Sequence, residues 1–121
     1  MIKNKSGIWG EVLTARYLRD RGFQILSSNY SCRLGELDLV AMIDETMCFV
    51  EVKTRGENPL MAPSEAVDSF KQERMIKTSS IYLKASGWKG KTRFDVSEVF
   101  LDDNFKLVKL NYIENAFGAE G

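Results

Sequence analysis

The chain has 121 residues, 44% hydrophobic and 28% charged, which is ordinary for a soluble globular protein and predicts one domain over residues 1–121. Its 17 basic and 17 acidic side chains cancel, so the net charge gives no argument for a nucleic-acid partner. The absence of histidine and the presence of only two cysteines exclude histidine-dependent catalysis and a zinc site. Any catalysis must therefore use carboxylates, lysine or an ion bound by oxygen atoms.

The first half of the chain predicts one helix and three strands. Apolar residues recur at helical spacing over residues 7–21, where Ser6 is a plausible cap and Gly22 a stop signal. A first strand is expected over residues 23–29, followed by a turn over 30–34. Polar and apolar residues then alternate over 36–43 and 47–54, which is the period of a half-buried strand.

The second half begins with a loop and a long helix. Glycine and proline residues mark 55–63 as the loop. Ser64 is the expected cap of the helix, with Glu65 and Asp68 in its first turn and Gly87 at its end. The expected apolar face of this helix runs through Val67, Phe70, Ile76 and Leu83.

The remaining residues predict a strand over 92–101, a turn over 102–104, a strand over 105–113 and a loose tail over 114–121. The element order is therefore α-β-β-β-α-β-β. A hairpin beside strands that are connected by a helix predicts a mixed central sheet flanked by helices, that is, an α/β sandwich.

The two central strands carry ionisable side chains at their polar positions, Glu36 and Asp38 on the first, Glu51 and Lys53 on the second. A two-residue loop at residues 44–45 would place Asp38 opposite Glu51 and Glu36 opposite Lys53. Directly opposed Cβ atoms lie ~4.5–5.5 Å apart, where two carboxylates repel each other. A hard divalent cation such as Mg²⁺ would make the pair tolerable, because it binds oxygen ligands.

A structural alternative explains the same residues without a metal. The strand face can be solvated, with Glu36 and Lys53 forming an ion pair that is worth little. A three-residue loop would also shift the register by one residue and send every side chain to the other face.

Charge is unevenly distributed along the chain. Residues 36–68 hold eight acidic and two basic side chains, a net charge of −6, whereas residues 71–93 hold seven basic side chains and one acidic, a net charge of +6. An acidic centre beside a basic helix suits a metal site that also binds a phosphodiester backbone. Lys71, Arg74 and Lys77 share one helical ridge, although a solvated lysine-rich face is the usual meaning of such a run.

Several motifs, in order along the chain, resemble the YraN-like family of endonucleases. They are Gly10-Glu11, Gly22-Phe23-Gln24-Ile25-Leu26, Cys32-Arg33-Leu34-Gly35-Glu36-Leu37-Asp38, Val50-Glu51-Val52-Lys53 and Arg93-Phe94-Asp95-Val96. The resemblance extends to about Val99. It implies the PD-(D/E)XK nuclease superfamily, close to Holliday-junction resolvases, with a restriction-endonuclease-like three-layer sandwich and metal-dependent cleavage of a phosphodiester.

The resemblance also implies residue roles. Asp38 and Glu51 match the metal-binding carboxylates, Lys53 matches the lysine of the Glu-x-Lys motif, and Glu11 matches a helix glutamate near the metal. All four are therefore candidate catalytic residues, and Mg²⁺ or Mn²⁺ is the expected cofactor. The candidate nucleic-acid-binding residues are Arg55, Lys71, Arg74 and Arg93. Arg93 and Asp95 are equally suited to a structural ion pair.

Two functions remain open from the sequence. The first is a metal-dependent endonuclease acting on nucleic acid, with DNA favoured and branched or damaged DNA as one option. The second is a catalytically silent module of the same fold that binds nucleic acid or a protein partner. A homodimer is compatible with both. No stretch approaches the ~20 apolar residues of a membrane span and no segment resembles a signal peptide, so we expect a cytoplasmic protein without a membrane partner.

Overall fold

The computed structural model describes residues 4–56 and 67–118. Within these ranges two helices and five strands follow the expected order. They are α1 (Lys5–Asp20), β1 (Gln24–Cys32), β2 (Gly35–Ile43), β3 (Thr46–Gly56), α2 (Ser69–Ser86), β4 (Lys91–Leu101) and β5 (Leu107–Phe117). The predicted α/β architecture with a mixed sheet is confirmed. No helix in the described ranges is long and apolar enough to cross a membrane.

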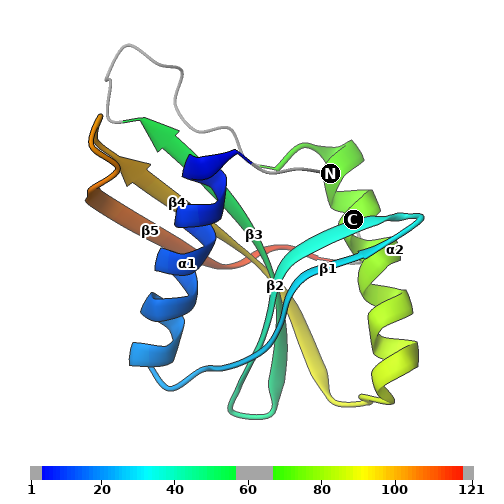
Figure 1. The fold of residues 1–121 in the computed structure, drawn as a ribbon. Helices are drawn as coiled ribbons and strands as arrows, with labels where there is room; N and C mark the ends of the chain where they lie inside the picture. Colours follow the sequence, from blue (N-terminus) through cyan, green and yellow to red (C-terminus); the bar gives the residue numbers. More distant parts are fainter. Residues whose placement is uncertain (1–3, 57–66, 119–121) are drawn as a thin grey trace.

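The strands form one sheet in the order β1-β2-β3-β4-β5. The pair β3 and β4 is parallel and the other pairs are antiparallel. A parallel pair needs a crossover connection, and α2 provides it between β3 and β4. Figure 1 shows α1 and α2 on opposite sides of the sheet, which gives three layers.

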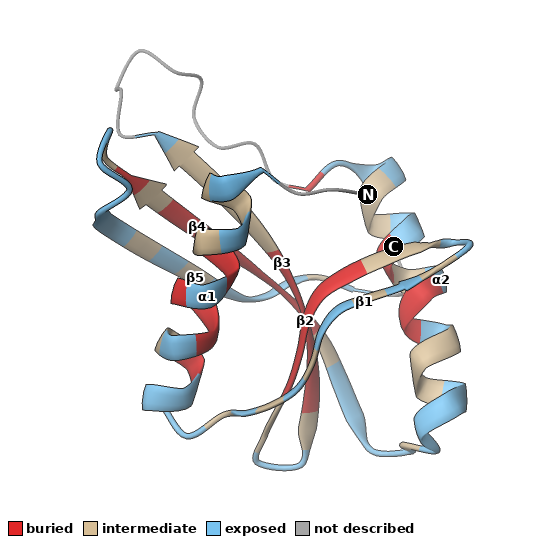
Figure 2. Cartoon of the chain, viewed as in Figure 1, coloured by how far each residue is buried: buried red, intermediate tan, exposed pale blue. Residues whose placement is uncertain are grey.

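Each helix covers its own hydrophobic core. Ala15 and Leu18 of α1 pack with residues of β2 and β3 that include Leu39 and Val50. On the other face, Met75 of α2 packs with a second cluster of sheet residues, which includes Val40, Met47, Phe49 and Phe94. Figure 2 shows the buried residues concentrated in the central strands and on the sides of the helices that face them. The alternation of β3 therefore sends Glu51 and Lys53 toward the α2 side of the sheet.

The β2–β3 turn has the two-residue form expected from the sequence. Ile43 pairs with Thr46, so Asp44 and Glu45 alone form the loop. Both loop residues have positive φ, 43° and 65°, which matches the right-handed twist of the flanking strands. The predicted register is thereby confirmed over residues 39–43 and 46–50. The pairing ends before Glu36 and Lys53, and Glu36 pairs with Ser31 of β1 instead.

Several predicted boundaries and caps were wrong. Strand β1 continues to Cys32 instead of turning after residue 29, because Tyr30 pairs with Leu37 and packs edge-on against Tyr82 of α2. Helix α2 begins at Ser69, and its cap is Asp68, whose side chain accepts a hydrogen bond from the Lys71 amide at 2.8 Å. The cap expected at Ser64 lies outside the described residues.

Another error concerns the C-terminal segment, which was expected to be a loose tail from residue 114. Strand β5 instead runs to Phe117, whose ring stacks on Phe94 with centroids 4.9 Å apart. The amide of Asn115 donates to the buried carboxylate of Asp95 at 2.8 Å. At the other end of the chain, Asn4 rather than Ser6 caps α1, because its side chain accepts from the Gly7 amide at 2.8 Å.

The contact between α1 and β3 depends on a glycine. A Cβ atom at Gly10 would lie 2.1 Å from the Thr54 hydroxyl oxygen, far inside van der Waals contact. We expect Gly10→Ala to lower the free energy of unfolding by ~1–3 kcal/mol, because overpacking outweighs the gain in helix propensity of about 1 kcal/mol. Urea unfolding measures this loss. Adding Thr54→Ala should recover part of it, and a Gly10→Ala protein as stable as wild type would contradict the close packing.

Candidate active site

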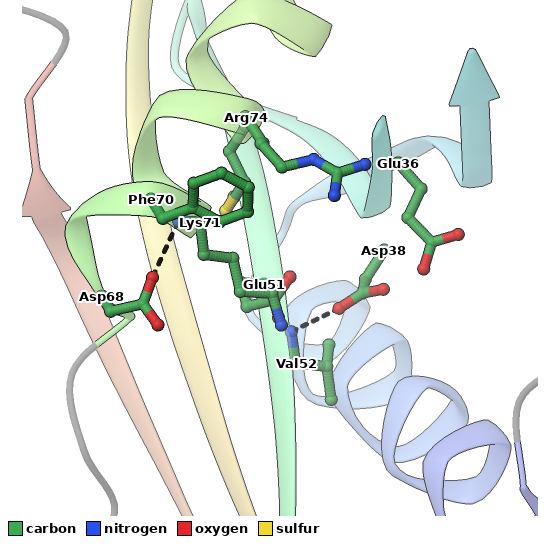
Figure 3. A pocket seen from close by; sticks show the side chains of 9 residues that line it. Glu36, Asp38, Glu51, Val52, Asp68, Phe70, Lys71 and Arg74 are labelled. Carbon is green, nitrogen blue, oxygen red and sulfur yellow. Dashed lines mark hydrogen bonds and ion pairs between the residues drawn. The ribbon is translucent and has the colours of Figure 1, made fainter. Parts of the chain in front are cut away.

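The β2–β3 hairpin brings Asp38 and Glu51 together at the point where the two strands separate. The paired residues end at Leu39 and Val50, and the same register places Asp38 across from Glu51 one step further along. Beyond that step the Val52 amide donates to the Asp38 carboxylate at 2.8 Å, in place of a main-chain acceptor (Figure 3). Asp38 is thereby held with its carboxylate against β3.

Both carboxylates are 5% exposed and line the same pocket, which lies between β2, β3 and the first turns of α2. The cavity has a volume of about 400 Å³. Its walls are formed by Glu36, Asp38, Glu51, Val52, Asp68, Phe70, Lys71, Arg74 and Met75. Figure 3 shows that α2 supplies one wall and the two strands supply the other.

Burial makes the negative charge on Glu51 unfavourable. Its pKa is raised from 4.5 to about 7, first by burial and then by the neighbouring Asp38 carboxylate. The Lys71 ammonium acts in the opposite direction but does not cancel these two effects. The pair therefore favours either a proton or a positive ion between its oxygen atoms.

Two lysines lie close to Glu51. The Lys71 ammonium is 2.5 Å from Glu51 Oε2 and the Lys53 ammonium is 3.9 Å from the same oxygen. Burial and the neighbouring Lys71 charge lower the pKa of Lys53. Burial also acts to lower the pKa of Lys71, but Glu51, Lys53 and the Asp38 charge together outweigh it and raise this pKa overall. Lys71, expected to contact nucleic acid, thus pairs with a site carboxylate here.

The other basic candidates differ in their positions. Arg74 lines the pocket, and its Nε donates to the Leu34 carbonyl at 3.3 Å. Arg55 follows Lys53 on the same face of β3, and its Nε is buried without an acceptor among the described residues. Arg93 is placed elsewhere: it pairs with Asp95 at 3.0 Å and with Glu114 at 3.2 Å. Its position fits the structural ion pair that the sequence left open.

The structure does not place Glu11 among the residues that line the pocket. Glu11 is 8% exposed on α1, the helix on the other face of the sheet. The preceding residue, Gly10, contacts Thr54, which follows Lys53 on β3. Glu11 therefore lies at the level of the site along β3 but on the α1 side.

The site residues suit a hard divalent cation. Asp38 and Glu51 offer carboxylate oxygens, the ligands that Mg²⁺ and Mn²⁺ prefer. The described residues contain no group of three or more His, Cys, Asp or Glu side chains able to hold a metal. Mg²⁺ is commonly held by two carboxylates, and water and substrate phosphate fill its remaining coordination positions. The raised pKa of Glu51 fits this role, since the site favours positive charge.

Phe70 is the pocket residue whose position the sequence analysis got wrong. It was assigned to the apolar face of the helix, yet it is 68% exposed at the pocket. The buried face of α2 contains Met75, Thr78 and Ser79. At 3.6 residues per turn, Phe70 lies about 140° around the helix from Met75. This angle could have shown from the sequence that Phe70 is not on the buried face of the helix.

Comparisons with known proteins give one consistent family. A UPF0102 protein of Caldanaerobacter subterraneus subsp. tengcongensis is 42% identical over 117 residues, covering 95% of this chain and 96% of the relative. A UPF0102 protein of Alkaliphilus oremlandii is also 42% identical, over 121 residues, covering 96% and 100%. One of Moorella thermoacetica is 38% identical over 118 residues, covering 97% and 98%.

The family model for the uncharacterised protein family UPF0102 matches residues 10–99, which include the pocket carboxylates and both lysines beside Glu51. This match covers most of the chain and agrees with the family resemblance of its motifs, since YraN is a name for the same family. The names of the relatives state no activity. The chain is a member of the UPF0102 family.

Proposed function

We propose that this protein is a Mg²⁺- or Mn²⁺-dependent endonuclease that hydrolyses phosphodiester bonds in nucleic acid, with DNA as the favoured substrate. The main support is the convergence of Asp38 and Glu51 in one pocket, with the pKa of Glu51 raised by burial and by Asp38. Two adjacent buried carboxylates are costly to a fold, and such perturbed groups gather at functional sites. The element order also fits a restriction-endonuclease-like sandwich.

In this mechanism Asp38 and Glu51 would hold the metal ion through their carboxylate oxygens. When bound, the ion supplies Lewis acidity that lowers the pKa of water and neutralises charge on the scissile phosphate. The Val52 amide fixes the orientation of Asp38 through its hydrogen bond. Lys53, beside Glu51, donates a hydrogen bond to the phosphoryl oxygen on which negative charge develops.

Lys71 and Arg74 stand on the α2 wall, within the acidic pocket. The Lys71 ammonium contacts Glu51 Oε2, so a divalent cation bound by Glu51 would compete with this contact. Released from Glu51, the ammonium is placed to bind a phosphate of the substrate backbone. Arg55 lies two residues after Lys53 on the same face of β3, outside the pocket lining, and its buried Nε is a further donor near the site.

The Lys71–Glu51 contact also supports the second function, a catalytically silent module. An ammonium group 2.5 Å from Glu51 already provides the positive charge that the carboxylate pair favours, without a metal. Such a protein would bind nucleic acid in a salt-dependent way and would not cut it. The two functions therefore differ in whether a metal ion displaces Lys71 from Glu51.

Incubation of the purified protein with Mg²⁺ or Mn²⁺ and duplex, single-stranded, flap and four-way-junction DNA tests the proposal. We expect cleavage of at least one substrate, and we expect Asp38→Ala to abolish it. Asp103→Ala, which removes an exposed carboxylate from the β4–β5 turn, is the matched control and should cut normally. Activity that survives Asp38→Ala would indicate a contaminating nuclease. Binding without cleavage under either metal would favour the silent module.

A further inference from the structure

Phe70 is an aromatic side chain exposed at the mouth of the acidic pocket. Its exposed fraction of 68% is the largest among the exposed large hydrophobic residues in the described ranges, where the next values are 53%. It is the second residue of α2 and lines the same pocket as Asp38 and Glu51 (Figure 3). A single exposed apolar residue is common, but this one stands at the site.

The fold does not require an aromatic ring at this position. Helix α2 packs on the sheet through Met75, Thr78 and Ser79, and Phe70 points away from that face. The side chain of Asp68, two residues before Phe70, caps the N-terminus of the helix. The ring of Phe70 therefore makes its contacts at the pocket rather than in the core.

One basic group lies beside the ring and a second follows it on the helix. The Arg74 guanidinium carbon lies 5.8 Å from the ring centroid, within cation–π distance. The same guanidinium donates a hydrogen bond to the Leu34 carbonyl at 3.3 Å. Lys71, the next residue after Phe70, extends into the pocket. Figure 3 shows these three side chains along one wall.

Proteins bind single-stranded nucleic acid by stacking bases on exposed aromatic rings and by contacting phosphates with nearby cations. We propose that Phe70 stacks on an unpaired base next to the scissile phosphate, so that the site selects strands with unstacked bases over continuous duplex. This rests on the proposed nuclease function. In a duplex both faces of each base are already stacked on neighbours. A cavity of about 400 Å³ has room for one nucleotide-sized group.

The test measures binding without cleavage, with Ca²⁺ in place of Mg²⁺ or Mn²⁺, using a fluorescent oligothymidylate and a blunt duplex of equal length. We expect Phe70→Leu to weaken binding of the single strand on the order of tenfold, from the loss of one stacking contact. Binding of the duplex should not change. Phe70→Trp should bind the single strand at least as tightly as wild type, because its ring also stacks.

Phe105→Leu is the matched control. Phe105 is a second exposed aromatic residue with a cation beside it, Lys5 at 5.4 Å from the ring, and it lies at the β4–β5 turn outside the pocket. We expect this variant to bind both nucleic acids like wild type. Photocrosslinking with an oligonucleotide that carries 5-iodouracil should also label Phe70, and peptide mass spectrometry identifies the position.

The outcomes separate the stacking proposal from the proposed function. If Phe70→Leu binds the single strand like wild type while Lys71→Ala or Arg74→Ala weakens it, nucleic acid enters the pocket without stacking and this inference is wrong. Equal weakening for single strand and duplex would overturn the selectivity. If the wild-type protein binds neither nucleic acid even at low salt, both the inference and the proposed function fail.

Discussion

Lys53→Ala is expected to slow cleavage on the order of a hundredfold or more while leaving the fold and the metal ligands intact. A hydrogen-bond donor aimed at charge that develops in the transition state is worth this much. Stability should change by less than ~1 kcal/mol, because the ion pair of Lys53 with Glu51 is long, at 3.9 Å. Burial and Lys71 lower the pKa of Lys53, so the fold gains little from its charge.

Single-turnover cleavage rates together with thermal melting measure the two effects separately. Lys77→Ala is the control: Lys77 pairs with Glu73 at 3.1 Å on the exposed side of α2, and both side chains are more than half exposed. The Lys77→Ala protein should cleave nucleic acid at the wild-type rate. Lys53→Arg should recover little activity, since a planar guanidinium does not replace a compact ammonium. Wild-type cleavage by the Lys53→Ala protein would show that Lys53 is not a catalytic residue.

The architecture could be predicted from the sequence because, in each element, the hydrophobic pattern and the turn residues favour the same local structure. The β2–β3 hairpin was predictable in register, since two acidic residues separate two alternating strands and a two-residue loop permits one pairing. The boundaries that were wrong depend on contacts distant in sequence. Phe117 extends β5 because it stacks on Phe94, and no local pattern encodes that contact.

The sequence placed Asp38 and Glu51 next to each other for the same reason, because residue spacing in a hairpin determines which residues are opposed. The α2 wall was harder to predict. Lys71 pairs with Glu51, and this contact depends on how the crossover helix lies over the sheet. Arg93 carried the same charge signal as Arg74, yet it points to Asp95 and Glu114 instead of the pocket. A count of basic residues does not distinguish these cases.

Divalent metal is expected to stabilise the free protein in a pH-dependent way. Binding to the folded state alone adds roughly 2.7 kcal/mol when the ion is in hundredfold excess over its Kd. For a protein of this size, that corresponds to a rise in melting temperature on the order of 10 °C. Asp38→Asn and Glu51→Gln should each remove most of the rise. Glu73→Gln, which changes an exposed carboxylate on α2, should keep it.

The pH dependence follows from Glu51, whose folded-state pKa is raised from 4.5 to about 7 by burial and by Asp38. In the metal-free protein, protonated Glu51 contributes stability that is fully present below pH 4.5 and is lost as the pH rises through about 7. A metal ion needs the deprotonated carboxylate, so it competes with this proton.

The metal-induced rise in melting temperature should therefore be small at about pH 6 and should grow until about pH 8, one unit on either side of the Glu51 pKa. Lys71 also competes for Glu51, but its raised pKa keeps it charged across this range, so it lowers the metal affinity without adding a pH step. Differential scanning fluorimetry with millimolar Mn²⁺ or Mg²⁺ measures the rise at each pH. A melting temperature that neither metal changes at about pH 8 would contradict a metal site formed by Asp38 and Glu51 in the free protein.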